Sequence, residues 1–188
     1  MIVHKTSLPG VRLIDPRVFP EARGWLFESW SKERYGAEGI ATEFMQDNVS
    51  YSIAGVLRGL HFQHPNDQGK LVSVLEGEIY DVIVDIRPDS DTFRRWIGVV
   101  LSGENHRQLW VPEGFAHGFL ARKPSIVTYK ATAPYHPASA RVVLWSDEDL
   151  GIDWPVRDPL LSEPDARAPR LREVPRELLP RVGERAQR

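Results

Sequence analysis

The sequence EGEIYDVIVDIR, residues 76–87, is the stretch that decides the fold class of this chain. It opens with Glu76-Gly77, a pair that is typical of a hairpin turn. From Tyr80 onward every second side chain is apolar, while Asp81 and Asp85 lie between them, so the two kinds of side chain occupy opposite faces of an extended strand. We therefore predict a β-strand over Ile79–Arg87.

Outward from this strand, the chain from Val11 to Trp145 consists of short extended segments separated by turns rich in Gly, Pro, Asn, Asp and Ser. The other predicted strands are Leu26–Trp30, Met45–Tyr51, Leu57–Gln63, Leu71–Leu75, Ile97–Leu101, Leu109–Val111, Phe115–Leu120, Ile126–Ala131 and Val142–Trp145. About ten strands at this spacing favour a closed all-β structure, because closure removes exposed sheet edges. We expect a jelly-roll β-sandwich or barrel with a short helix over Ser31–Gly36.

The composition changes at Glu163, because the last 26 residues hold seven arginines and four prolines. Prolines at this frequency interrupt long helices. We expect a packed C-terminal arm followed by a loose end. The sequence is thus predicted to form a single domain over residues 1–172, with an arginine- and proline-rich tail over residues 173–188.

Composition excludes several classes of protein. A formal net charge of -2 over 188 residues provides no general field that would attract nucleic acid. Cysteine is absent, which excludes thiol catalysis, thiolate zinc clusters and disulfides. The N-terminal sequence MIVHKTSLPG lacks the apolar segment of a signal peptide, and nowhere do about 18 apolar residues run together. We expect a cytoplasmic protein with no membrane or nucleic-acid partner.

A first group of polar residues lies in and just after the predicted strand Leu57–Gln63. His61 and Gln63 lie on one face of an extended strand, and Arg58 and Lys70 are close in sequence. Histidine exchanges a proton near neutral pH without a metal. A lone histidine is often a hydrogen-bonded structural residue, but so many polar groups inside a barrel are costly unless a polar ligand compensates them. His61 is therefore a candidate general base.

A second group is VPEGFAHGF, residues 111–119, which sets His117 between two phenylalanines on one face of a strand. The pattern Pro-x-Gly-x-x-His is similar to the second metal-binding motif of the cupin superfamily. The first motif of metal-binding cupins, His-x-His with a nearby Glu, is replaced here by His61-Phe62-Gln63. Glutamine is a poor ligand for a transition metal, so we predict no metal site.

Two tyrosines and an aspartate are candidates for completing a proton-transfer site. Tyr129 lies in the predicted strand Ile126–Ala131, and Tyr135 follows Pro134. Each is compatible with a packing role. A buried phenol also donates a proton to a carbanion or enolate. Asp165 either orients a histidine or is a solvated carboxylate of the C-terminal arm, and sequence spacing leaves both interpretations open.

The N-terminal part of the chain carries four further candidates. Arg23 and Glu28 flank a flexible turn and aromatic residues, and Gln46 and Asn48 offer groups that read a base or a sugar. Polar turn residues are the alternative interpretation. The sequence has no phosphate-binding glycine loop, so a phosphate would be held by arginine and lysine side chains.

Several strings occur together in an order that resembles one family, the dTDP-4-dehydrorhamnose 3,5-epimerases, which are metal-independent members of the cupin superfamily. They are Arg23-Gly24 with Phe27-Glu28, Gln46–Ser50, Gly55–Gln63, Gln68–Val72, Asp81–Arg87, Pro112–Phe119, Tyr129, Tyr135, Gly151–Pro155 and Leu161-Ser162 with Asp165. The resemblance extends from about residue 9 to residue 172.

The resemblance implies a role for each candidate residue. His61 would be the base, Asp165 its partner, and Tyr129 the acid. Lys70 and His117 would line the sugar site. Nucleotide-sugar binding is implied for Arg23, Glu28, Gln46, Asn48, Arg58 and Tyr135. The N-terminal residues of this set are expected to reach across the interface of a homodimer.

The implied reaction inverts carbons 3 and 5 of dTDP-4-dehydro-6-deoxy-D-glucose and gives dTDP-4-dehydro-L-rhamnose, for dTDP-L-rhamnose or a related deoxysugar. Both carbons neighbour the ketone at carbon 4, so removal of either proton gives an enolate with its charge on the same oxygen. We expect Lys70 to stabilise that oxygen. Neither a redox cofactor nor a metal is expected, because the ketone itself acidifies both protons.

Two positions depart from the family pattern. Ala140 stands where many members have glutamate, and Pro164 stands where a basic residue often precedes the aspartate. Both lie near the expected substrate and bear on nucleotide preference, on the sugar and on the number of carbons inverted. An epimerase acting at one carbon and a non-catalytic nucleotide-sugar-binding cupin are therefore the alternatives.

Overall fold

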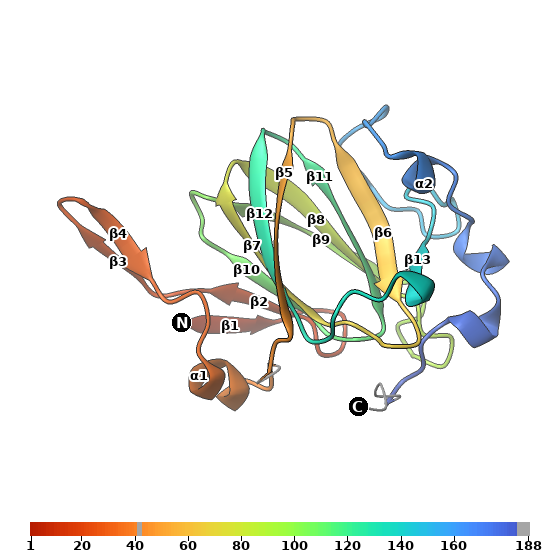
Figure 1. The fold of residues 1–188 in the computed structure, drawn as a ribbon, viewed down its shortest axis with the longest axis horizontal. Helices are drawn as coiled ribbons and strands as arrows, with labels where there is room; N and C mark the ends of the chain where they lie inside the picture. Colours follow the sequence, from red (N-terminus) through yellow and green to blue (C-terminus); the bar gives the residue numbers. More distant parts are fainter. Residues whose placement is uncertain (41–42, 184–188) are drawn as a thin grey trace.

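The computed structural model describes residues 1–40 and 43–183 and contains two antiparallel β-sheets that face each other (Figure 1). The six-stranded sheet has the order β1 (Ile2–Lys5), β2 (Arg12–Asp15), β10 (Gln108–Val111), β7 (Lys70–Glu76), β12 (Ser125–Ala131) and β5 (Gln46–Ser52). The five-stranded sheet has the order β13 (Ala140–Val142), β6 (Leu57–Gln63), β11 (Phe115–Ala121), β8 (Glu78–Asp85) and β9 (Trp96–Ser102). Strands that are distant in sequence, such as β2, β10 and β7, are neighbours in the sheet, as in a jelly roll. The predicted all-β jelly-roll fold is confirmed.

The N-terminal strands differ from the sequence-based prediction. β1 and β2 were not predicted, and β3 (Val18–Glu21) pairs with β4 (Gly24–Phe27) in a hairpin that projects from the body of the molecule (Figure 1). The prediction of a strand over Leu26–Trp30 is therefore wrong, because the strand ends at Phe27. Each of these strands has four residues, too few for a clear alternation, and β1 and β2 are held by pairing with each other and with β10.

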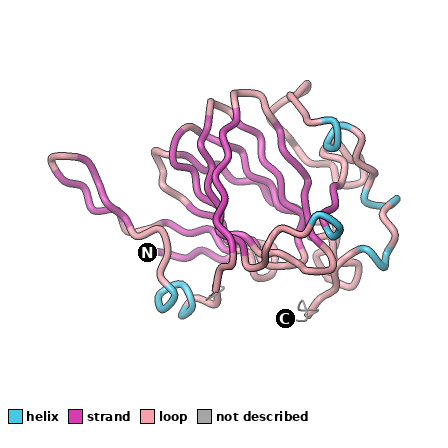
Figure 2. Tube along the Cα trace, viewed as in Figure 1, coloured by secondary structure: helices cyan, strands magenta, loops and turns pink. Residues whose placement is uncertain are grey.

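The helices are short and lie around the sheets (Figure 2). α1 (Lys32–Ala37) begins after Ser31, whose hydroxyl accepts a hydrogen bond from the Arg34 N–H, close to the helix predicted from the sequence. The other helical segments are η1 (Pro137–Ser139), α2 (Glu163–Ala166), η2 (Leu171–Glu173) and η3 (Arg176–Leu178). Within the described residues, every helix is too short or too polar to cross a bilayer.

Both faces of the five-stranded sheet are covered. On the inner face, Ile79 and Ile83 of β8 belong to a core between the two sheets. On the outer face, Val82 and Val84 pack in a second core that the C-terminal part of the chain completes. That part contributes Val143, Leu150, Trp154, Leu171, Val174 and Leu179. The apolar outer face is thus closed by the arm, and the arm packs on the sheet as far as Leu179.

One glycine allows β6 and β11 to approach closely. Gly59 has φ of +124°, and a Cβ at this position would lie 2.6 Å from the Cα of Gly118. Any other residue would be strained and would collide with the neighbouring backbone. The pairing of β6 with β11 shifts by a bulge between His117 and Phe119. The strands that carry the two candidate histidines are therefore adjacent because of the glycines between them.

Candidate active site

Two histidines lie side by side on the inner face of the five-stranded sheet. His61 of β6 and His117 of β11 are direct partners in the strand register. Leu60 and Phe62, on either side of His61, belong to the outer core, which turns His61 to the inner face as the alternation predicts. His117 lies between Phe115 and Phe119, which are both in the inner core. The prediction of the two faces is confirmed for both strands.

His61 is paired with the carboxylate of Asp165. The Nε2 atom of His61 lies 2.6 Å from Oδ1 of Asp165, although the two residues are 104 positions apart. The side chain of His61 is 42% exposed and that of Asp165 only 4%. The pair therefore has a buried carboxylate behind an accessible imidazole, in which Nδ1 is the ring nitrogen left to accept a proton.

Asp165 is held by the first turn of α2. Ser162 is the residue before this helix, and its hydroxyl accepts a hydrogen bond from the Asp165 N–H at 3.3 Å. Burial by itself would raise the pKa of Asp165, but hydrogen bonds from His61 and Ser162 and the charge of His61 outweigh burial and lower that pKa. The Gly59 N–H acts in the same direction. Asp165 therefore stays a carboxylate beside the His61 ring.

His117 has a carboxylate of its own, which sequence analysis did not assign to the site. Its Nε2 atom lies 2.6 Å from Oδ1 of Asp81 on the neighbouring strand β8. The side chain of His117 is 9% exposed and Asp81 is fully buried. The other oxygen of Asp81 has no hydrogen-bond partner among the described residues. The sequence placed Asp81 on the face opposite Val82 and Val84, but which of the two faces is the inner one, and the pairing of Asp81 with His117, depend on the arrangement of the strands.

Lys70 approaches from the opposite sheet, at the start of β7. Burial lowers the pKa of Lys70 to about 8, while the charge of Asp81 acts to raise it. The Nζ atom lies 5.7 Å from the centroid of the Tyr129 ring. Lys70 is therefore a cation near neutral pH that interacts with the charge of Asp81 and lies near an aromatic ring, with its proton held less firmly than in water.

Tyr129 lies on β12, on the face that packs into the inner core. Burial raises the pKa of Tyr129, and the nearby charge of Arg58 acts to lower it. Arg58 in turn donates to the hydroxyl of Ser52 at 3.0 Å. The phenol is thus protonated at neutral pH and carries a proton that it can donate.

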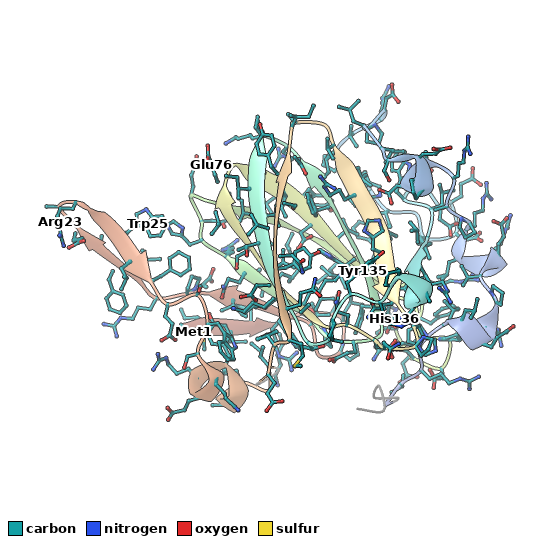
Figure 3. All side chains as sticks on the ribbon, viewed as in Figure 1. Met1, Arg23, Trp25, Glu76, Tyr135 and His136 are labelled. Atoms are coloured by element: carbon teal, nitrogen blue, oxygen red, sulfur yellow. The ribbon has the colours of Figure 1, made fainter. Side chains whose placement is uncertain are left out.

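The amide residues lie on β5, opposite Tyr129. Asn48 is the register partner of Tyr129, and the Gln46 amide donates to Oδ1 of Asn48 at 2.9 Å. The Gln46 side-chain oxygen accepts from the Tyr135 N–H at 2.8 Å. The ring of Tyr135 is exposed and lies beside η1 (Figure 3). The structure therefore connects Gln46, Asn48 and Tyr135 with the strand of Tyr129.

Arg23 and Glu28 lie apart from these residues. Arg23 is at the tip of the β3–β4 hairpin, where it pairs with Glu21 at 2.8 Å, and Figure 3 shows it far from Tyr135. Glu28 follows the hairpin and is bound by Arg34. Within one chain the structure does not bring Arg23 and Glu28 to His61.

The side chains that could bind a metal are engaged elsewhere. His61 and His117 each bind a different aspartate, and the amide of Gln63 binds the backbone of a neighbouring loop. Over residues 1–40 and 43–183, no group of three or more His, Cys, Asp and Glu side chains is arranged to hold a metal ion.

Comparison with known proteins decides the family. A model of the dTDP-4-dehydrorhamnose 3,5-epimerase family matches residues 5–173. The chain belongs to this family. The dTDP-4-dehydrorhamnose 3,5-epimerase of Salmonella typhimurium is 51% identical over 175 residues, which cover 91% of this chain and 96% of the relative. The sequence-based identification of the family, and of an isomerase, is confirmed.

Solved epimerase structures share the fold. The dTDP-6-deoxy-D-glucose-3,5-epimerase of Legionella pneumophila, in complex with dTDP-4-keto-L-rhamnose, is 46% identical with a TM-score of 0.94, over 97% of this chain and 99% of that one. A 3′-monoepimerase from Streptomyces bikiniensis, in complex with dTDP-quinovose, is 34% identical with a TM-score of 0.85, over 90% of this chain and 87% of that one. Epimerases of one and of two carbons thus have the same architecture.

The two departures from the epimerase pattern lie beside the candidate site. Ala140 begins β13 and is the register partner of Gln63, two residues after His61. Pro164 is in the first turn of α2, next to Asp165. Neither residue contributes a charged or hydrogen-bonding side chain there.

Proposed function

We propose that this epimerase inverts carbons 3 and 5 of dTDP-4-dehydro-6-deoxy-D-glucose to give dTDP-4-dehydro-L-rhamnose, with His61 as base and Tyr129 as acid. The observation that carries the proposal is the pairing of an accessible His61 with a buried Asp165 at 2.6 Å. A buried carboxylate fixes the ring of the base and stabilises the imidazolium that forms. The resemblance and the relatives support the choice of substrate.

Deprotonation is the first chemical step. Nδ1 of His61 removes the proton from carbon 3 or carbon 5, and the electrons of the C–H bond move into an enolate whose negative charge lies on the oxygen at carbon 4. Lys70 donates a proton or a hydrogen bond toward that oxygen. A preorganised donor of this kind typically contributes about 10²–10³ in rate. One cation serves both carbons, because both enolates place their charge on the same atom.

Protonation from the opposite face completes the inversion. The Tyr129 hydroxyl delivers its proton to the enolate carbon, and the ketone re-forms as the oxygen returns any proton it took from Lys70. The His61 imidazolium then releases its proton to solvent and the phenolate recovers one from solvent, which prepares the site for the second carbon. The raised pKa of Tyr129 keeps the phenol protonated until the strongly basic carbanion is present. Acid and base catalysis of this type each contribute roughly 10²–10⁴ in rate. We propose that neither step needs a metal or a redox cofactor.

The nucleotide part is proposed to bind through Arg58, Gln46, Asn48 and Tyr135, with His117 at the sugar. An exposed aromatic ring such as Tyr135 has a free face against which a planar base packs. Arg23 lies at the tip of the β3–β4 hairpin and Glu28 follows it, and neither joins this group within one chain. We therefore propose a homodimer in which the partner's hairpin completes the site, and we keep the cytoplasm as the expected compartment.

Exposed apolar side chains on the hairpin support the homodimer. Phe19 is 45%, Trp25 53% and Leu26 67% exposed. Trp25 and Phe27 pack on the His106 ring, but these apolar side chains stay exposed within one chain, and a second copy would cover them. A test is to mix Arg23→Ala with His61→Asn chains after subunit exchange. A shared site predicts that activity returns in the mixture, since one of its two sites has both native residues, whereas no recovery would contradict the shared site.

The proposed reaction is tested by deuterium incorporation. Incubation with dTDP-4-dehydro-6-deoxy-D-glucose in deuterated water, followed by NMR, is expected to show exchange and inversion at carbons 3 and 5 that an enzyme-free sample lacks. Preincubation with a chelator is expected to change nothing, and a chelator-sensitive rate would contradict the metal-free mechanism. Exchange at one carbon selects the monoepimerase. Binding of the nucleotide sugar without exchange at either carbon selects the non-catalytic cupin.

A further inference from the structure

Two loops at one end of the sheets are joined by side-chain hydrogen bonds. Residues 64–69 connect β6 to β7, and residues 132–136 connect β12 to η1. The bonds between the two loops and their flanks join Gln63 to Pro134 and His136, Asn66 to Ser139, Gln68 to Ala133, and Gly69 to Thr132. The first loop leads into Lys70 and the second carries Tyr135. Both residues belong to the proposed site. Because hydrogen bonds join the two loops, the position of one loop affects the position of the other.

Gln63 is central to this arrangement because its amide binds on both sides of Tyr135. Its Nε2 atom donates to the Pro134 carbonyl at 3.1 Å, and its Oε1 atom accepts from the His136 N–H at 2.8 Å. Nε2 also donates to the carbonyl of Asn66. Gln63 is 7% exposed, so few water molecules can replace these bonds. Together with the Gln46 bond to the Tyr135 N–H, the backbone is fixed at three consecutive residues, 134 to 136.

We propose that Gln63 is a positioning residue that holds the Tyr135 loop in place for nucleotide binding. It lies two residues after His61 on the same strand, so it links the base of the reaction to the residue that contacts the nucleotide. Metal-binding cupins carry the second histidine of His-x-His at this position. In this chain the side chain at that position is an amide, and it binds the Tyr135 loop. The inference rests on the proposed function, because it takes Tyr135 as a nucleotide-binding residue.

The first test compares two glutamines of the same loop pair. Gln63→Met keeps the length of the side chain and removes the bonds around Tyr135. Gln68→Met is the matched control, since Gln68 donates one bond to Ala133 and none to Pro134 or His136. We expect Gln63→Met to raise the Kd for dTDP and the KM about tenfold while kcat falls less than about threefold. Gln68→Met is expected to leave the Kd within about twofold.

The second test separates positioning from a general loss of structure. In a double-mutant cycle on dTDP affinity, Gln63→Met is expected to have little further effect once Tyr135→Ala is present, because Gln63 acts through Tyr135. Equal effects in both backgrounds would overturn the proposal. An unchanged Kd in Gln63→Met, with native unfolding temperature, would overturn it as well. If Gln63→Met does not fold, Gln63→Glu, which keeps the acceptor for His136, takes its place in the cycle with the same expected result.

Measurements on the wild-type enzyme separate failure of the proposed function from failure of the role of Gln63. Wild-type protein that neither binds dTDP nor exchanges deuterium contradicts the proposed function. Wild-type protein that does both, combined with a Gln63→Met variant of native Kd, contradicts only the role of Gln63.

Discussion

The two histidine–aspartate pairs have the same length and different surroundings. His61–Asp165 and His117–Asp81 are both 2.6 Å long, and the histidines are register partners on adjacent strands. The imidazole of the first pair is 42% exposed and that of the second 9%. An accessible imidazole can reach a substrate proton, whereas a buried one serves as a fixed donor. Exposure, not pair geometry, is therefore what supports the proposal of His61 as the base.

The origin of each aspartate explains the difference. Asp81 comes from β8, the strand next to His117, and the inner core packs around this pair. Asp165 comes from α2 in the C-terminal arm, which approaches the edge of the sheet near β6. A carboxylate delivered from outside the sheet leaves the imidazole accessible. The arm thus covers the outer core and also supplies the carboxylate that pairs with His61.

The largest effect is expected from removing the accessible imidazole. His61→Asn should lower kcat roughly 10³-fold without changing the Kd for dTDP, because it removes the base and leaves the nucleotide contacts. His117→Asn should lower kcat about tenfold. His4→Asn is the matched control, since it breaks a His–Asp pair of 2.7 Å on β1 and β2, far from the site. Equal losses for His61 and His117 would contradict the assignment made from exposure.

Substitution of Asp165 is expected to affect mainly kcat, and substitution of Asp81 mainly the free energy of unfolding. Asp165→Asn should lower kcat about 10²-fold, because an amide no longer stabilises the imidazolium or fixes its orientation. Asp81→Asn alters a fully buried pair and should lower the free energy of unfolding by about 1–3 kcal/mol. Steady-state kinetics and denaturant unfolding of both variants measure the two quantities. A larger loss of kcat in Asp81→Asn than in Asp165→Asn would reverse the comparison.

The smallest expected effect is a pH dependence of kcat/KM that comes from Lys70. Since burial lowers the pKa of Lys70 to about 8, kcat/KM should fall as the pH rises through about 8 and the cation is lost. Lys70→Arg should retain a cation at higher pH and move this limb upward. The unfolded chain holds the lysine proton more firmly than the folded one. The free energy of unfolding of the wild-type protein should therefore increase, relative to that of Lys70→Met, as the pH rises from about 8 to 10.5. If kcat/KM of Lys70→Arg falls at the same pH as that of the wild-type enzyme, Lys70 is not the group whose titration causes the fall.

Much of the fold was predictable because it depends on local alternation. The strand over Leu57–Gln63 was predicted with the bounds of β6, and Phe115–Leu120 differs from β11 by one residue. The N-terminal strands β1 to β3 were not predictable in this way, because each has four residues and depends on a partner strand. The predicted strand Val142–Trp145 meets β13 only at Val142, and the Leu144 N–H binds Pro169 of the arm instead of a strand.

By itself, the sequence determined which residues have the chemistry for proton transfer and which side of a strand they occupy, because residue type and period two are local properties. His61 opposite Leu60 and Phe62, and His117 between Phe115 and Phe119, follow from that rule. Only the tertiary structure decided that Asp165 meets His61, that Asp81 meets His117 and that the Gln63 amide encloses the Tyr135 loop. These contacts join residues that are 36 to 104 positions apart in the sequence. Such residues meet because of the order of the strands in the sheets and the path of the chain between them, which a local pattern does not determine.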